Sequence, residues 1–141
     1  YTCDSLHNRL SKNGMVHHSN ALHQLLDDGE NRFTYDQAGN LIGRENEKEA
    51  IAYRYDAADR LIAVDGDYKV RYEYDAFNRR MAKITGNSKI RYLYAGQDEI
   101  GAVDEAGHFL ELRILGKGHG AEIGAGIAIE LKGEVFTPLH D

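Results

Sequence analysis

The stretch that decides the fold lies in the middle of the chain. Residues 51–61 read IAYRYDAADRL, and residues 70–81 read VRYEYDAFNRRM. A third copy of the same phrase opens at residues 90–94, which read IRYLY. The second tyrosines of these copies lie 19 and 20 residues apart: Tyr55, Tyr74 and Tyr94. A phrase that returns at such a steady interval indicates a repeat architecture, in which each copy is one supersecondary unit.

The same phrase occurs upstream. Residues 31–41 read NRFTYDQAGNL, and residues 1–10 read YTCDSLHNRL, with Cys3 at a tyrosine position. A degenerate copy, HHSNALHQL, occupies residues 17–25 between them. We therefore predict six copies, anchored at these residues: Asp4, Asn20, Asp36, Asp56, Asp75 and Ala95.

Alternation within the phrase predicts antiparallel strands. In residues 68–74, apolar or aromatic side chains alternate with Lys69, Arg71 and Glu73, which is the two-residue period of a half-buried strand. The dipeptide at residues 65–66, Asp-Gly, separates this run from the apolar run before it, and that order is a strong hairpin signal. Each copy therefore supplies two short strands and two turns, and the predicted fold class is all-β, a series of tandem antiparallel β-hairpins.

Stacking of the hairpins should place equivalent aromatic residues side by side on one face. One predicted rank contains the second tyrosines: Tyr35, Tyr55, Tyr74 and Tyr94. The other predicted rank lies two residues earlier, with Ile51, Val70 and Ile90 extending the face: Phe33, Tyr53, Tyr72 and Tyr92. We expect these ranks to be a buried core, in which Tyr74→Ala costs about 3 kcal/mol or more.

The reiterated phrase Tyr-x-Tyr-Asp, followed by small residues, a turn residue and Arg or Asn, resembles the Rhs/YD-repeat family, the tyrosine–aspartate repeat proteins of bacteria. The resemblance is strongest from Phe33 to Tyr94, and residues 96–141 are similar to a segment within Rhs-type cores. It implies a strip of β-hairpins wound into a curved, hollow β-shell that encloses a C-terminal effector in toxin members. The self-cleavage motif of such members, with its Asp-Pro signature, is absent here, so the resemblance implies no catalytic residue.

The resemblance divides the chain into tandem repeats at residues 1–94 and an Rhs-core-like hairpin segment at residues 95–141. In the second part, a glycine-rich loop is predicted at residues 116–126. Twelve positions are predicted to carry the structural repeat: Tyr35, Asp36, Tyr53, Tyr55, Asp56, Arg60, Tyr72, Tyr74, Asp75, Arg79, Tyr92 and Tyr94.

The aspartate of each copy has two readings, both structural. Its carboxylate can close the turn through Asx hydrogen bonds, or it can pair with the arginine four residues later, as Asp56 with Arg60 and Asp75 with Arg79. A carboxylate at an active site is the functional alternative. Reiteration favours structure, because an active site is rarely copied several times at even spacing.

Bulk composition excludes several classes of protein. The 141 residues are 42% hydrophobic and 28% charged, which is a globular composition. With 17 basic against 23 acidic residues and a net charge of −6, the chain lacks the basic footprint of a nucleic-acid binder. No apolar run approaches the ~20 residues of a membrane helix. The single cysteine, Cys3, is expected to be a small buried residue and not a reactive thiol.

Candidate chemical motifs fail on context. Residues 116–121, GKGHGA, match a dinucleotide phosphate loop, but that loop must open a helix, and the glycines and alternation that follow predict a loop or strand. The histidines at residues 17, 18 and 23 lack metal-ligand spacing, and His119 with Glu122 lacks the second histidine of a metalloprotease. We predict no enzyme activity, cofactor or metal.

Two functions remain. The first is a structural module, part of an Rhs-type shell that encapsulates or displays a C-terminal toxin or effector, with the parent's other repeats and that effector as partners. The second is a cell-surface module for carbohydrate binding or adhesion, in which exposed tyrosines would stack on a glycan. Either function implies a secreted or cell-surface location by family resemblance. Because both ends interrupt a repeat, we expect a fragment of a longer chain whose open strand edges favour self-association.

Overall fold

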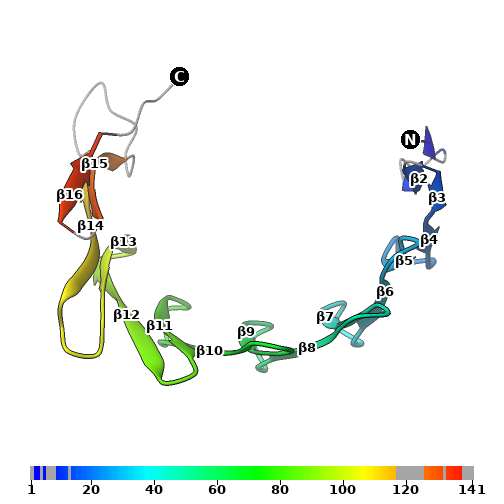
Figure 1. Ribbon diagram of the computed structural model, residues 1–141, viewed down its shortest axis with the longest axis horizontal. Coiled ribbons are helices and arrows are strands. Elements are labelled where there is room, and N and C mark those ends of the chain that lie inside the picture. The colour runs from blue at the N-terminus through cyan, green and yellow to red at the C-terminus, as the bar shows by residue number, and fades with distance from the viewer. Residues whose placement is uncertain are drawn as a thin grey trace. The chain divides into compact units, whose positions relative to one another are not determined.

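The computed structural model describes residues 2–3, 5, 9–12, 14–116, 126–131 and 133–137, without the side chains at positions 9, 12, 126 and 127. The chain divides into two compact units, Tyr1–Val70 and Arg71–Asp141. Every regular element in the described residues is a β-strand, which confirms the all-β prediction. Figure 1 shows these strands as a succession of hairpins.

The first unit contains nine complete strands: β1 (Thr2–Cys3), β2 (Arg9–Lys12), β3 (Met15–Val16), β4 (His18–Ser19), β5 (Leu25–Asp27), β6 (Arg32–Tyr35), β7 (Leu41–Glu45), β8 (Ala50–Tyr55) and β9 (Leu61–Asp65). Strands β1–β3 form a small sheet of their own, and β4–β9 lie in the larger sheet in the order of the chain. Residues 20–27 form a turn and the strand β5.

Strand β10 (Lys69–Tyr74) leads into the second unit, which contains these further strands: β11 (Arg80–Thr85), β12 (Ser88–Ala95), β13 (Asp98–Val103), β14 (Phe109–Leu115), β15 (Gly126–Leu131) and β16 (Glu134–Phe136). Strands β11–β16 again follow chain order in the sheet. The pairings from β11 to β16 are antiparallel, for example Ala82 with Arg91.

Register places the repeat residues on one face of each unit's sheet. In the first unit, Tyr53 lies opposite Val64 and Tyr55 opposite Leu61. Arg54 lies on the other face, opposite Ala63. Because successive side chains alternate between faces, we call the side that carries Tyr53 and Tyr55 the aromatic face. In the second unit Tyr92, opposite Ala102, defines it.

A β-bulge accompanies the second tyrosine in three described copies. The register shifts between Thr34 and Tyr35, between Arg54 and Tyr55, and between Leu93 and Tyr94. A bulge sets two residues of one strand against one of its partner and increases the local twist. The second tyrosine therefore lies at a local distortion of the strand pair, directly before the turn.

The expectation that the tyrosines form a buried core is wrong, because their side chains are only partly buried. The buried hydrophobic side chains among the described residues are small ones, Ala63, Ala82, Ala102 and Val103. The predicted aromatic positions are all half-buried, since nothing in the described part of the chain forms a second layer over them. The expected cost of Tyr74→Ala therefore falls to about 2 kcal/mol.

The expectation that Cys3 is buried is also wrong, because the side chain is exposed. It lies in β1, a strand of two residues in a three-stranded sheet. None of the described residues covers Cys3 in this small sheet. Exposure alone does not make the thiol reactive, and no role for it follows.

Candidate functional site

Five turns are built on one hydrogen-bonding pattern: Asn20–Gln24, Asp36–Asn40, Asp56–Arg60, Asp75–Arg79 and Asp104–His108. In each, the N–H of the first residue donates to the carbonyl of the fifth at 2.9–3.0 Å. The N–H of the fourth residue donates back to the carbonyl of the first at 3.0–3.3 Å. The pattern is that of a tight turn followed by one residue in the left-handed region.

The fourth position of every such turn has a positive φ. It holds Gly39 and Gly107 at 94° and 89°, but His23, Asp59 and Asn78 at 61°, 57° and 65°. Aspartate and asparagine tolerate this region better than other residues with a side chain. The turn residue of the repeat phrase is therefore selected by backbone conformation.

The first residue closes the turn with its side chain. In the Asp75 turn, Oδ1 accepts hydrogen bonds from the N–H groups of Phe77 at 2.8 Å and Arg79 at 2.9 Å. Oδ2 accepts from the guanidinium of Arg79, with Nε at 2.7 Å and Nη2 at 2.7 Å. Asp56 and Arg60 repeat the arrangement, again with Nε 2.7 Å from Oδ2. Each carboxylate thus makes the Asx turn and the ion pair together.

These contacts lower the pKa values of the turn carboxylates. For Asp36 and Asp56, side-chain hydrogen bonds from Asn40 and Arg60 are the main cause. For Asp75, desolvation acts to raise the pKa, but the backbone and side-chain hydrogen bonds of Arg79 outweigh it and the pKa is lowered. A carboxylate held ionised in this way is a poor general acid near neutral pH.

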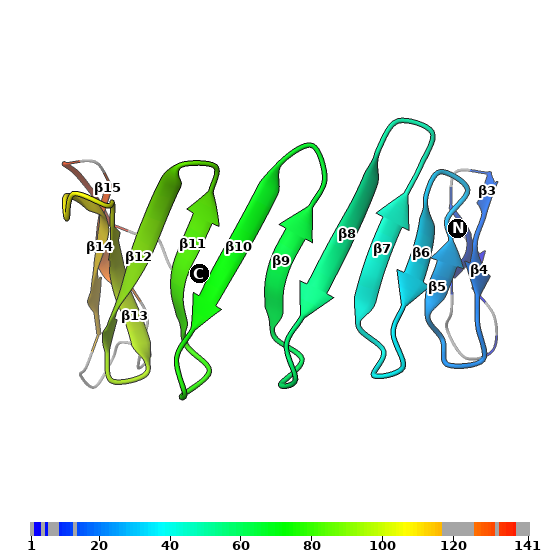
Figure 2. The same ribbon diagram turned by 90° about the horizontal axis from the view of Figure 1, so that it is seen from below.

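Neighbouring turns on the same sheet edge are joined by the fifth residue. Asn40 Nδ2 donates to Asp59 Oδ1 in the next such turn of the first unit, at 2.8 Å. In the second unit, Arg79 Nη1 donates to the carbonyl oxygen of Gly96. Figure 2 shows the turns after β6 and β8 at the same end of the hairpins of the first unit. The fifth residue thus links successive hairpins as well as closing its own turn.

The second tyrosines bond to the preceding hairpin, whereas the fifth turn residues bond to the following one. The hydroxyl of Tyr35 donates to the carbonyl of Leu25 at 2.9 Å, and that of Tyr94 donates to the carbonyl of Arg80 at 2.9 Å. Leu25 and Arg80 are equivalent, because each directly follows the turn of the preceding repeat. Burial raises the pKa of Tyr94, so its hydroxyl remains a neutral donor at physiological pH.

Arginine side chains stack between the aromatic rings of the second unit. The guanidinium carbon of Arg80 lies 5.5 Å from the ring centroid of Tyr72 and 4.9 Å from that of Tyr92. Arg79 lies 5.0 Å from the ring of Tyr94. Cation–π contacts at these distances are attractive. Aromatic rings and guanidinium groups therefore lie next to one another in the second unit.

An ionic cluster lies on the same face. Arg113 Nη1 is 3.2 Å from Glu99 Oε1, and Arg113 Nε bonds to Glu111. The hydrogen bond with Glu111, aided by the charges of both glutamates, raises the pKa of Arg113. Both carboxylates are thus paired with the same cation, the guanidinium of Arg113.

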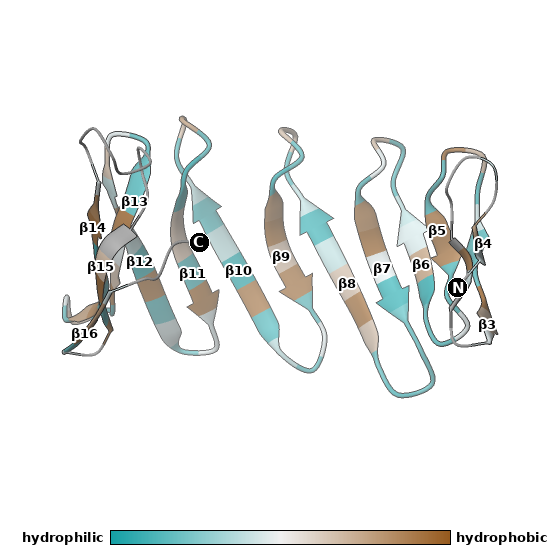
Figure 3. Cartoon of the chain, turned by 90° about the horizontal axis from the view of Figure 1, so that it is seen from above, coloured by the Kyte–Doolittle hydropathy of each residue, from teal (hydrophilic) through white to brown (hydrophobic). Residues whose placement is uncertain are grey.

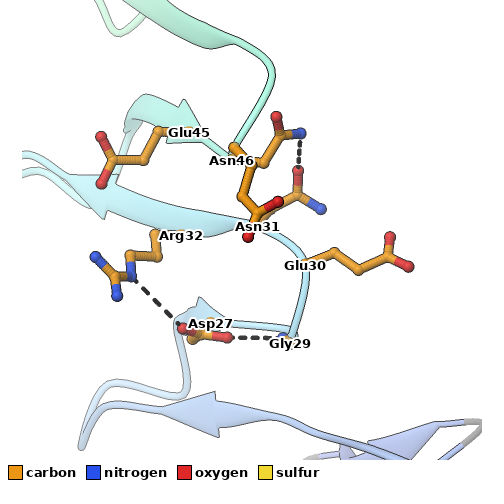
Figure 4. A pocket seen from close by; sticks show the side chains of 8 residues that line it. Asp27, Gly29, Glu30, Asn31, Arg32, Glu45 and Asn46 are labelled. Carbon is orange, nitrogen blue, oxygen red and sulfur yellow. Dashed lines mark hydrogen bonds and ion pairs between the residues drawn. The ribbon is translucent and has the colours of Figure 1, made fainter.

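A polar depression of about 380 Å³ lies at the opposite edge of the first unit. Its lining is mostly carboxylate and amide: Asp27, Gly29, Glu30, Asn31, Arg32, Glu45, Asn46 and Glu47. Figure 4 shows Asn46 donating to Asn31, a contact of 3.0 Å, and Asp27 accepting from the N–H of Gly29 at 2.7 Å.

Other candidates from the sequence add no site. Among the described residues, no three histidine, cysteine or acidic side chains are grouped so that they could hold a metal ion. None of those residues forms a helix with the length and apolar character that a membrane crossing requires. The phosphate-loop match at residues 116–121, which the sequence context already argued against, lies outside the described residues except for Gly116, and so do His119 and Glu122.

Together the turns, the stacked rings and the hairpin order define a class of protein, a β-hairpin repeat module whose recurring residues hold the sheet together. The sequence model of the Teneurin YD-shell family matches residues 2–105, more than half of the chain. The chain therefore belongs to the Teneurin YD-shell family, and it is an Rhs-type shell module made of YD repeats.

One curated relative is the toxin protein Tse5 of Pseudomonas aeruginosa. It is 39% identical to this chain over 61 residues, which cover 38% of this chain and 5% of Tse5. The chain thus corresponds to a small part of the length of that relative.

The sequence predicts a turn at residues 104–107 but not its Asx closure, and it predicts a repeat anchor at Ala95. The turn Asp104–His108 has the same Asx closure, with the N–H of His108 2.8 Å from Asp104 Oδ1, although no tyrosine pair precedes it. At the predicted anchor Ala95, by contrast, a two-residue loop pairs Ala95 with Asp98, and Gly96 has a φ of 67°. The spacing of aspartate and glycine in residues 104–107 was the signal for the turn at Asp104.

Proposed function

We propose that this chain is part of the wall of a shell that encapsulates or displays a C-terminal toxin or effector of its parent protein. The observation that carries the proposal is the half-buried aromatic face, which has no second layer over it in the described part of the chain. Family membership and the similarity to a toxin protein support it. The mechanism is steric, since a continuous sheet keeps the cargo from water, targets and proteases.

In this proposal the twelve repeat positions named from the sequence have a structural role, and the chain is not an enzyme. Residues 1–94 are the tandem repeats, and residues 95–141 continue the wall as a hairpin segment. The partners are the parent's other repeats and its effector, and the location is secreted or at the cell surface, as the family and relative suggest.

Limited proteolysis of the full-length parent tests the proposal. The C-terminal segment should resist an added protease while the shell is folded, and a matched sample of that segment expressed alone should be digested quickly. Loosening the wall with mild denaturant should restore digestion of the segment within the parent. Equal digestion of the enclosed and isolated segments would show that the wall encloses nothing.

The aromatic face supports a second candidate, a module that binds cell-surface carbohydrate. Half-exposed rings such as Tyr72 and Tyr92, with Arg80 beside them, offer stacking surfaces and hydrogen-bond donors to a sugar. Glycan-array binding by the chain, lost in Tyr92→Ala and retained in Tyr68→Ala, would favour this candidate. An array without hits would count against it.

A further inference from the structure

One charged side chain of the second unit departs from the pattern of the repeat. The residue directly after the turn is leucine in three copies of the first unit: Leu25, Leu41 and Leu61. After the Asp75 turn it is Arg80. Figure 3 shows hydrophobic colour at the start of β7 and of β9, the strands that open with two of these leucines. Because the other copies form the same turn with leucine there, the fold itself does not require the charge of Arg80.

The guanidinium of Arg80 is held by aromatic rings and keeps its hydrogen-bond donors open. It comes from β11 and lies 5.5 Å from the ring centroid of Tyr72 in β10 and 4.9 Å from that of Tyr92 in β12. Its side chain is exposed, and no carboxylate in the described part of the chain forms an ion pair with it. A guanidinium carries its N–H donors in its own plane, so stacking on rings orients them without using them.

A second cation, Lys83, lies on the same face. Its register with β12 places it on the side of the sheet that carries Tyr92, and it too has no ion pair with a described carboxylate. The acidic side chains of this face that act on Tyr92, Glu99 and Glu111, are already bound by Arg113. The aromatic face of the second unit therefore carries two cations whose charge no described carboxylate neutralises by direct contact.

We propose that this face binds carboxylate side chains of the effector segment of the parent, with the guanidinium of Arg80 as the main receiving group. The inference rests on the proposed wall, and it names the chemistry of the cargo in contact with this part of it: an acidic stretch of polypeptide. A planar guanidinium can donate two parallel hydrogen bonds to one carboxylate, and such pairs are among the stronger polar contacts in proteins.

A carboxylate of a peptide suits this surface better than a sugar ring does. The guanidinium lies close to the rings of Tyr72 and Tyr92 and so takes up ring surface on which a sugar would stack, whereas its own N–H edge stays open. The chain as a whole has a net charge of −6, which gives no general attraction for an acidic partner. Binding of an acidic peptide must therefore be local, at the cations of this face.

Fluorescence anisotropy of a labelled peptide of alternating glutamate and serine, titrated with the whole chain, tests the proposal. The same peptide with glutamine in place of glutamate is the reference, and a labelled oligogalacturonate presents carboxylates on a sugar. Arg80→Leu is the test variant, because three other copies carry leucine at this position. Arg91→Leu is the matched control, because it removes an exposed arginine whose pairing with Ala82 places it on the opposite face. Circular dichroism and the urea midpoint establish that both variants are folded.

The glutamate peptide should bind, and Arg80→Leu should raise its dissociation constant at least about tenfold, while Arg91→Leu leaves it within about twofold. Arg80→Lys should also bind more weakly than the wild-type chain, because it keeps the charge but loses the planar pair of donors.

Three results overturn the proposal: no binding of the glutamate peptide, equal binding of the glutamine peptide, or a control that weakens binding as much as Arg80→Leu. Tighter binding of the oligogalacturonate than of the peptide overturns it in favour of the carbohydrate-binding candidate. If the parent protects its C-terminal segment from protease in any of these events, the wall stands and only this contact fails.

Discussion

At the scale of single residues, the second tyrosine of a repeat works through both its ring and its hydroxyl. The ring of Tyr94 contacts Arg79, and its hydroxyl bonds to the carbonyl of Arg80. Since Tyr35 makes the equivalent bond to Leu25, the contact is a recurring link between one repeat and the hairpin before it. This explains why tyrosine, and not phenylalanine, suits the position.

Tyr94→Phe should therefore lower the free energy of unfolding by about 1 kcal/mol, because it removes one hydrogen bond and keeps the ring. Urea denaturation followed by circular dichroism measures the change. Tyr68→Phe is the control, since Tyr68 is 80% exposed and its substitution should have no measurable effect. Equal stability of the wild-type chain and Tyr94→Phe would show that the hydroxyl contributes nothing.

Asn78 tests the backbone requirement of the turn. Its φ of 65° lies where a side chain with a Cβ is strained, so Asn78→Ala should destabilise the chain by about 1 kcal/mol. Asn78→Gly should be at least as stable as Asn78→Ala, because glycine adopts this region freely. Thermal unfolding of the three proteins gives the order. If alanine were tolerated better than glycine, conformation would not be what selects the residue here.

At the scale of elements, the turn is the unit that the sequence repeats. One carboxylate satisfies two backbone N–H groups and a side chain, as Asp75 does with Phe77 and Arg79. A turn closed in this way fixes where one strand ends and the next begins, and the adjoining bulge sets the local twist. The element is thus specified locally, before any hairpin meets its neighbour.

The turn carboxylates make the free energy of unfolding depend on pH. The pKa values of Asp28, Asp36, Asp56, Asp75 and Asp104 are all lowered from their ordinary value of 3.8. Groups with a folded pKa below the unfolded one stabilise the fold above the unfolded pKa, and that contribution is lost as pH falls through the folded pKa. The urea midpoint should therefore be steady from pH 7 to about 5 and decline below pH 4.

Asp75→Asn separates this effect from general acid denaturation. The variant should be less stable than the wild-type chain at pH 7, and the difference should shrink at pH values where Asp75 is protonated in both states. The same urea titration, carried out at each pH, measures it. A wild-type chain that gained stability on acidification below pH 4 would contradict the assignment.

At the scale of the whole molecule, the unusual quantity is exposed surface. The accessible surface is 10449 Å² for a chain of 15.8 kDa, whereas a globular monomer of that mass exposes about 7,300 Å². In the described residues, the half-buried aromatic side chains of an uncovered sheet face contribute to this exposed surface. Such a chain is stabilised mainly by contacts between neighbouring hairpins, as other stacked repeats are.

Less surface buried on folding means less surface exposed on unfolding. The slope of the free energy of unfolding against urea concentration should therefore be small for 141 residues, about 1 kcal/mol per molar urea. Equilibrium urea denaturation monitored by tyrosine fluorescence gives the slope. A slope typical of a globular domain of this length would indicate a second layer that covers the aromatic face.

Sequence alone determined the strands, the turns and the repeat, because each is fixed by nearby residues: alternation sets the strands, and aspartate with a residue that accepts positive φ sets the turn. It also indicated the ion pairs of Asp56 with Arg60 and Asp75 with Arg79, four residues apart. Only the tertiary structure decided how deeply the tyrosines are buried and what their hydroxyls, Arg80 and the fifth turn residues contact. Those properties depend on neighbouring hairpins and on whether anything covers the sheet, and no local pattern encodes either one.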